Sequence, residues 1–221
     1  MLIDAGTAAD APVIVEALTE QGVDQLSFLV LSNATAEFVE GALRIADHIP
    51  IERVILSTFH SENVFLGEQL NALMAKGVKI TFQSYSKLYR FGDLNFTIYP
   101  PLEKNYRNAN NYSLCVLLQH GDVRMFFAGS AHKQRTEELL RFNFPNVTLY
   151  KIADHGHANN LTRDLLEVLQ PEYSVVTGAL ADSDISKTIA GQGGCLLYTA
   201  NGDLHFSSNR KLLKYLTDQQ H

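Results

Sequence analysis

The chain has 221 residues, of which 46% are hydrophobic and 19% are charged, and its formal net charge is −6. These values are typical of a globular domain with a sizeable core and exclude a disordered chain. The acidic balance argues against sequence-independent binding of DNA or RNA, which requires Lys and Arg side chains to displace counterions. We therefore expect a single domain over residues 1–221 that does not bind nucleic acid.

The first third of the chain predicts strands and helices in alternation. Apolar runs indicate strands at residues 2–3, 26–31 and 53–56. Apolar residues at helical spacing indicate three helices: the first is capped by Asp10 and ends at Gly22, the second includes residues 38–46, and the third includes residues 66–74 and ends at Gly77. This order is typical of a mainly parallel sheet covered by helices.

The rest of the chain predicts both hairpins and further helices. Strands are expected at residues 78–82, 88–91, 94–99, 112–119, 123–128, 147–152 and 173–177, with helices at 136–142 and 162–169. Residues 195–199 and 203–207 read as a closing hairpin about Asn201-Gly202. An α/β (α+β) fold, a four-layer α-β-β-α sandwich, accommodates the parallel and the hairpin parts. The pattern alone fits a doubly wound single sheet nearly as well.

The cysteines and the apolar runs bear on the compartment. Cys115 and Cys195 lie in apolar strand-like runs without a CxxC pair, so we expect two buried free thiols in a reducing compartment. No apolar stretch approaches the length of a membrane span, and no signal peptide follows Met1. We expect a cytoplasmic protein with no membrane segment, unless an upstream targeting segment has been removed.

Four segments, in order, carry a resemblance to a known superfamily. They are Leu2–Gly6 (LIDAG), Ser32–Gly41 (SNATAEFVEG), Asn111–Leu114 followed by Phe126–Ser130 (NYSL and FFAGS), and Lys151–His157 (KIADHGH). They resemble LIDxG, S-H-x-[HD]-x-D-H-x-x-G, N-x-S-L with LLTGD, and L-K-x-x-H-H-G-S of the metallo-β-lactamase-fold superfamily. The last motif is most similar to the ComEC-type branch, which contains the soluble domain of DNA-uptake competence proteins. The resemblance implies the four-layer sandwich, here without its first N-terminal hairpin.

The departures from these motifs fall on the positions that hold metal in the superfamily. There, histidines and carboxylates hold two metal ions that share a nucleophilic water. In this chain the leading histidine positions carry Asn33 and Thr35, and Glu37 replaces the aspartate. Phe38 replaces a histidine, and Ser130 replaces the aspartate that bridges both metals. The resemblance therefore implies an old cleft that has lost dinuclear hydrolysis, and we expect no metal cofactor.

A rebuilt site with one metal ion is the alternative. Asp154 replaces one histidine of the last motif, His155 remains, and His157 stands where the superfamily has serine. Together with Glu37, these side chains could hold one Zn²⁺ or Mn²⁺ ion through N and O ligands. The competing interpretation is a polar loop whose side chains bond to the backbone around Gly156.

A nucleophile at Ser130 is a further hypothesis. Its hydroxyl could join His155 and Asp154 in a Ser-His-Asp triad, but the second glycine of a nucleophile elbow is missing. The simpler interpretation makes Ser130 the N-cap of the following helix.

Two function classes follow from the sequence. The first is a binding or scaffold domain, a pseudoenzyme, for an unknown protein or small-molecule partner. The alternative is a metal-dependent phosphodiesterase or nuclease with a reduced mononuclear site. The sheet edge that the missing hairpin would cover in the superfamily is expected to be covered either by a homodimer or by an upstream segment of the full gene product.

Overall fold

The computed structural model describes residues 1–60 and 64–216. Contacts divide the chain into two compact units. The N-terminal unit comprises Met1–Ser84 and Glu103–Asn105, and the C-terminal unit comprises Tyr85–Leu102 and Tyr106–His221. The interpretation of residues 1–221 as one domain stays a prediction.

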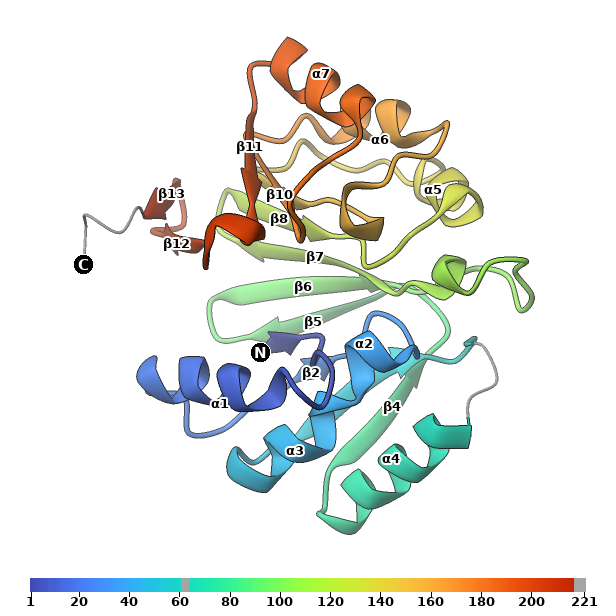
Figure 1. Cartoon of the computed structure of the whole chain (residues 1–221), viewed down its shortest axis with the longest axis vertical. Coiled ribbons are helices and arrows are strands. Elements are labelled where there is room, and N and C mark those ends of the chain that lie inside the picture. Colours follow the sequence, from blue (N-terminus) through green and yellow to red (C-terminus); the bar gives the residue numbers. More distant parts are fainter. Residues whose placement is uncertain (61–63, 217–221) are drawn as a thin grey trace. The chain divides into compact units, whose positions relative to one another are not determined.

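The N-terminal unit is built on a parallel sheet of four strands (Figure 1). Their order is β1 (Leu2–Ile3), β2 (Leu29–Val30), β3 (Arg53–Ser57) and β4 (Lys79–Gln83). The helices are α1 (Ala11–Glu20), α2 (Ala36–Val39), α3 (Gly41–His48) and α4 (Val64–Ala75). Leu29, Val54 and Leu56 from the strands pack with Ile45 and Leu73 from the helices in one hydrophobic core. This confirms the parallel, helix-covered sheet that the alternating pattern predicts.

Two elements of this unit differ from the prediction. The expected strand at residues 26–31 is reduced to β2, and Leu26 forms only an isolated bridge to Ile51. The expected helix at 38–46 is divided into α2 and α3 at Glu40. The break brings Gly41 against the backbone of residues 5–7, a contact between distant segments that helical spacing cannot reveal.

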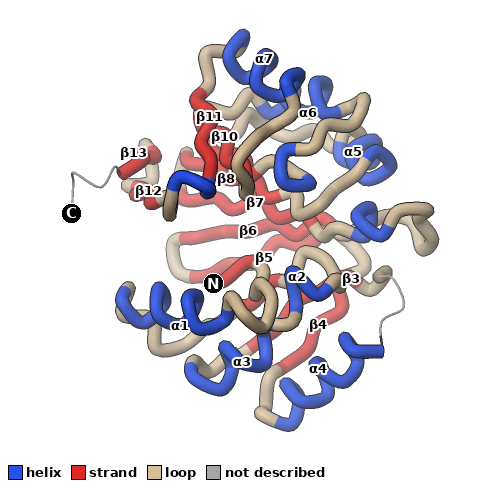
Figure 2. Tube along the Cα trace, in the orientation of Figure 1, coloured by secondary structure: helices blue, strands red, loops and turns tan. Residues whose placement is uncertain are grey.

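The C-terminal unit contains a mixed sheet of seven strands (Figure 2). Their order is β11 (Cys195–Tyr198), β10 (Tyr173–Val176), β9 (Leu149–Lys151), β8 (Val123–Phe127), β7 (Cys115–His120), β6 (Leu94–Tyr99) and β5 (Lys87–Phe91). Strands β8 to β11 are parallel, and β5 to β8 form an antiparallel meander. The carboxyl ends of β8, β9, β10 and β11 therefore lie at the same edge of the sheet.

Helices pack on one face of this sheet, and a hairpin packs on part of the other, over β8 to β10. The helices α5 (Lys133–Leu139), α6 (Thr162–Leu169) and α7 (Ser183–Gly191) contribute Leu139, Leu166 and Ile189 to a core with Phe126 and Tyr150. On the other side, Leu213 and Phe206 from the hairpin β12 (His205–Ser208) and β13 (Leu213–Leu216) pack on Val123, Leu149 and Val175.

The expected closing hairpin is wrong. β11 pairs in parallel with β10, whereas β12 pairs with β13. Thr199–Asn201 forms a 3₁₀ turn between β11 and β12. Turn chemistry at Asn201-Gly202 predicted the bend correctly but not the partners of the flanking strands.

The α/β class is confirmed: each unit has a sheet with helices packed on it. Cys115 is buried, but Cys195 is exposed, because β11 is the outer strand of its sheet. In the part of the chain that the structure describes, no helix combines the length and apolar character needed to span a membrane.

Candidate functional site

Asp4 ties together the ends of β1 and β2 in the N-terminal unit. Its Oδ1 accepts a hydrogen bond of 2.6 Å from the Ser32 backbone N–H, and its Oδ2 accepts one of 2.9 Å from the Ser32 hydroxyl. Asp4 has a φ of 64°, a left-handed conformation that Asp tolerates better than most residues. The first motif and the start of the second are therefore one structural unit.

The residues that follow Ser32 are mostly buried. The Asn33 side chain is 5% exposed, and its Oδ1 accepts a 2.7 Å hydrogen bond from the Ala34 backbone. The Thr35 hydroxyl is buried without a hydrogen-bonding partner among the described residues. Glu37 is exposed in the first turn of α2, whereas the Phe38 ring is 5% exposed and belongs to the hydrophobic core. The second motif thus directs Phe38 into the core and Glu37 to the surface.

In the C-terminal unit, three loops leave the carboxyl ends of β8, β9 and β10. They carry Ser130, Asp154-His155 and Thr177 respectively. The Asp154 N–H donates to the Gly129 carbonyl oxygen at 3.2 Å, and the His155 Nδ1 lies 3.1 Å from the Thr177 carbonyl oxygen. The structure therefore brings the third and fourth motifs together at one edge of the sheet.

Ser130 is held by its backbone. Its N–H donates to the Ser113 hydroxyl oxygen at 3.0 Å, and that hydroxyl donates to the Asn110 carbonyl at 2.7 Å. The Ser130 side chain is 1% exposed, and its Oγ has no hydrogen-bonding partner in the described ranges. No Ser130–His155 hydrogen bond forms, so the triad is not assembled in this geometry. The N-cap interpretation is also wrong, because His132 occupies that position of α5.

The Asp154–Gly156 segment is a tight 3₁₀ turn after β9. Its three residues have φ values of 49°, 52° and 90°. The Asp154 Oδ1 accepts a hydrogen bond of 2.9 Å from the Asn110 side-chain amide, and the His155 Nδ1 also lies 3.0 Å from the Thr177 hydroxyl. Gly156 packs closely against the Val176 side chain and the Ala181 backbone. These bonds from side chains to neighbouring loops fix the turn.

His157 differs from its neighbours in this loop because it is exposed to solvent.

Behind the loop, the Tyr150 hydroxyl oxygen accepts a 3.4 Å hydrogen bond from the Ala153 N–H. Complete burial raises the pKa of Tyr150 well above its ordinary value, so that this hydroxyl stays neutral.

Sequence reasoning missed two partners of this loop, Asn110 and Thr177. Each lies in a segment distant in sequence from the residue it holds. The adjacent Asn110-Asn111 pair before a buried strand was the available indication, since Asn side chains commonly satisfy loop backbone and side-chain groups.

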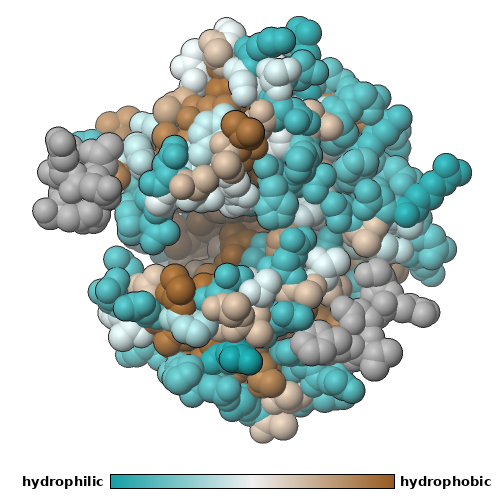
Figure 3. Space-filling view, viewed as in Figure 1, coloured by the Kyte–Doolittle hydropathy of each residue, from teal (hydrophilic) through white to brown (hydrophobic). Residues whose placement is uncertain are grey.

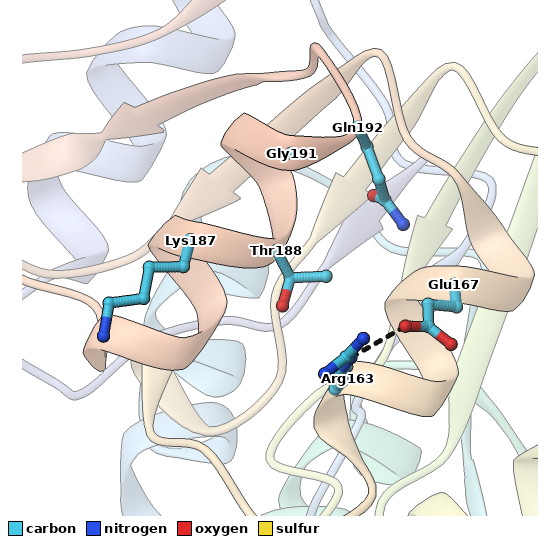
Figure 4. Close-up of a pocket in the computed structure, with 6 residues that line it drawn as sticks. All are labelled: Arg163, Glu167, Lys187, Thr188, Gly191 and Gln192. Atoms are coloured by element: carbon cyan, nitrogen blue, oxygen red, sulfur yellow. Dashed lines mark hydrogen bonds and ion pairs between the residues drawn. The ribbon is translucent and has the colours of Figure 1, made fainter.

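A hollow of the C-terminal unit lies between α6 and α7 and has a volume of about 400 Å³ (Figure 4). Arg163 and Glu167 from α6 form an exposed ion pair of 2.7 Å there, while Lys187 points away from them. Figure 3 shows that the visible surface around α5 and α6 is mainly hydrophilic. We interpret it as an ordinary solvated surface, and no metal-ligand group is found there among the described residues.

Comparison of the sequence with known proteins finds one curated relative. No family model matches the chain. ComE operon protein 3 of Bacillus subtilis is 23% identical to it over 167 residues, or 75% of this chain. The chain spans about a fifth of that protein's length.

Solved structures match over nearly the whole chain. Tm1679, a metal-dependent hydrolase of the β-lactamase superfamily, has a TM-score of 0.58 at 13% identity, covering 98% of this chain and 88% of that one. The metallo-β-lactamase-fold protein YhfI of Bacillus subtilis has a TM-score of 0.57 at 11% identity, covering 89% of this chain and 82% of that one. The chain has the metallo-β-lactamase fold.

The metallo-β-lactamase fold raises the question of whether these residues fit a pair of metal ions. At the motif positions, the Phe38 ring has no lone pair to donate, and its place in the core excludes it from a polar site. The neutral hydroxyl of Ser130 cannot supply the bridging carboxylate. The residues present do not fit the dinuclear centre that the motifs build.

The candidates for a single metal ion are distributed over both units. Asp154, His155 and His157 share one loop of the C-terminal unit, and Glu37 belongs to the N-terminal unit. Among the described residues, no three His, Cys, Asp or Glu side chains are grouped so that they could hold a metal ion. Their role as ligands stays a prediction.

Proposed function

We propose that this metallo-β-lactamase-fold chain has lost dinuclear metal hydrolysis and serves as a binding or scaffold domain. The packing of Phe38 carries the proposal. At a position where the motif has a histidine, its ring is 5% exposed in a core with Ala34, Val39 and Ala42. At this position the side chain therefore stabilises the core, whereas the histidine of the motif would bind metal.

The loops at the carboxyl edge of β8 to β10 are the part of the old site best suited to bind a partner. Asp154 is oriented by Asn110, and His155 is oriented by Thr177. Polar groups already held by neighbouring loops lose little conformational freedom when a ligand arrives. The edge would therefore suit a polar ligand or a polar protein loop better than an apolar one.

The alternative, a mononuclear phosphodiesterase or nuclease, rests on the environment of His155. Metal-binding histidines usually donate the N–H of their second ring nitrogen to a carbonyl or carboxylate, and Thr177 provides such a carbonyl to Nδ1. The exposed His157 and the bond from Asn110 to Asp154 weigh against a closed ligand set.

Elemental analysis after dialysis tests the proposal. We expect well under about one Zn or Mn ion per chain, because only a preorganised ligand shell retains its metal under dialysis. Two ions per chain would overturn the proposal.

Calorimetry with Zn²⁺ and Mn²⁺ tests the alternative. The wild type and a His155→Ala/His157→Ala double variant are expected to give the same heats, as is the control His48→Ala, which removes an exposed histidine from the N-terminal unit. Saturable heat that disappears only in the double variant would favour the mononuclear hydrolase over the binding domain.

We also propose a homodimer through β1. It is an outer strand of the N-terminal sheet and pairs with β2 on one side. Outer strands can pair with another chain. A molar mass by light scattering that stays that of one chain at concentrations of about 100 μM, within the range where weak dimers form, would exclude the dimer.

A further inference from the structure

Arg135 of α5 is an arginine whose side chain is entirely buried. Its guanidinium donates three hydrogen bonds: Nε to the Ser113 carbonyl at 2.9 Å, Nη2 to the Tyr99 carbonyl at 2.6 Å, and Nη1 to Glu138 Oε2 at 2.8 Å. Tyr99 ends β6, and Ser113 lies just before β7. One side chain thus joins the two ends of the β6–β7 connection, residues 100–114.

Glu138, one turn further along α5, accepts hydrogen bonds from residues within the same connection. It is 2% exposed, and its Oε2 accepts a 3.1 Å hydrogen bond from the Leu102 N–H. The Tyr106 hydroxyl donates to its Oε1. Arg135 and Glu138 together therefore hold the connection at four points.

The energetics of buried ion pairs suggest what this pair does. Removing two charges from water costs about as much as their attraction returns, so apolar side chains of similar volume often give equal or greater stability. The buried guanidinium instead fixes three acceptors in one plane, which an apolar group cannot do. The pair makes five hydrogen bonds, one between its two side chains and four to the connection. Its main effect is therefore to select one conformation of the connection, and its effect on stability is smaller.

That conformation reaches the candidate site. Asn110, which holds Asp154, and Ser113, which accepts the Ser130 N–H, both lie in the connection that the pair binds. The Arg135 N–H also donates to the Asn111 side-chain oxygen at 3.0 Å. The contacts run without interruption from the buried pair to the two loops of the site.

We propose that Arg135 and Glu138 are a positioning pair, which holds the β6–β7 connection in the conformation that places Asn110 on Asp154 and Ser113 on Ser130. The proposal concerns the shape of the site. It is independent of whether the site binds a partner or a metal ion.

Hydrogen exchange in an apolar double variant, Arg135→Met/Glu138→Leu, tests the proposal. The informative amides are Asn111 and Ser130, because their N–H groups bond to neither mutated side chain. We expect exchange at both to accelerate by about tenfold or more, while Val175 in β10, a strand that pairs with a neighbour on each side, changes by less than about twofold. Comparison with Val175 separates a local release of the connection from a loss of global stability.

The matched control is Glu137→Leu/Arg141→Met, which removes an exposed ion pair of 3.4 Å at the surface of the same helix. Its exchange rates should stay within about twofold of wild type at all three amides. Unchanged rates at Asn111 and Ser130 in a folded Arg135→Met/Glu138→Leu protein would overturn the proposal.

If that double variant does not fold, Tyr106→Phe still tests the arm through Glu138. It removes only the hydroxyl that donates to Glu138. We expect the Leu102 amide to exchange about threefold faster with the urea midpoint nearly unchanged. No acceleration at Leu102 would show that Glu138 does not hold the connection, and the pair would lose its assigned role.

Discussion

Replacing Gly41 by alanine should test whether the second motif is built around a backbone contact. A Cβ atom at Gly41 would overlap the carbonyl oxygen of Ala5, lie 3.0 Å from the Ala5 carbonyl carbon and lie 3.1 Å from the Thr7 carbonyl oxygen. These atoms are backbone, so no side-chain rotation can relieve the overlap. The segments at residues 5–7 and 38–41 would have to separate.

The cost follows from what that separation breaks. The Gly41 N–H donates to the Gly6 carbonyl at 3.0 Å, and the Ala5 N–H donates to the Phe38 carbonyl at 2.9 Å. Overpacking costs about 2–3 kcal/mol, and two weakened backbone bonds add about 2 kcal/mol. The higher helix propensity of alanine returns about 1 kcal/mol. We expect a net loss of about 3–4 kcal/mol in the free energy of unfolding.

Urea unfolding followed by circular dichroism measures this loss. The matched control is Gly67→Ala in α4, where no atom lies within 4 Å of the added Cβ and where alanine should stabilise the helix by about 0.5–1 kcal/mol. If Gly41→Ala unfolds within about 1 kcal/mol of wild type, the close backbone contact does not exist in solution, and the reasoning fails.

Three further outcomes are expected. Asp4→Ala should destabilise by about 2–4 kcal/mol, because it removes two hydrogen bonds from Ser32 to a carboxylate, and Asp4→Asn should lose less in the same urea titration because its amide oxygen still accepts. One thiol, that of the exposed Cys195, should react with Ellman's reagent in the native protein. Cys115 should react only on unfolding, since burial raises the pKa of its thiol, and rapid labelling of both thiols would contradict this. Duplex and single-stranded DNA should bind weakly at physiological salt because the net charge is −6, and a salt-dependent sub-micromolar affinity by fluorescence anisotropy would refute that expectation.

Local pattern was enough for most elements of the fold and failed where distant segments decide the outcome. The helix expected at 162–169 is observed with those limits as α6. Its apolar face and its position before a buried strand both indicate a helix that packs on the sheet, so local pattern and tertiary packing favour the same structure. The helix expected at 38–46 breaks at Glu40, because Gly41 must meet the backbone of Ala5. Helix α7 and strand β13 are not among the predicted elements.

The candidate site could be read from sequence only at the positions that match a motif. Phe38 and Ser130 stand out because a known pattern defines what they replace. The partners that orient the site come from separate loops and have no motif: Asn110 is 44 residues from Asp154, and Thr177 is 22 residues from His155. Arg135 lies just before the helix expected at 136–142, where no sequence pattern distinguishes it, and only the packing of the sheet shows that it is buried.

The left-handed turn after β9 has an evolutionary consequence. Asp154 and His155 adopt φ values of 49° and 52°, which cost a residue with a side chain about 1 kcal/mol or more compared with glycine. If the turn contributed only its backbone path, glycine at both positions would relieve this strain. In relatives that keep side chains at these positions, the side-chain contacts would have to contribute more free energy than the left-handed backbone costs. Sequencing such relatives would show whether natural selection still acts on this turn.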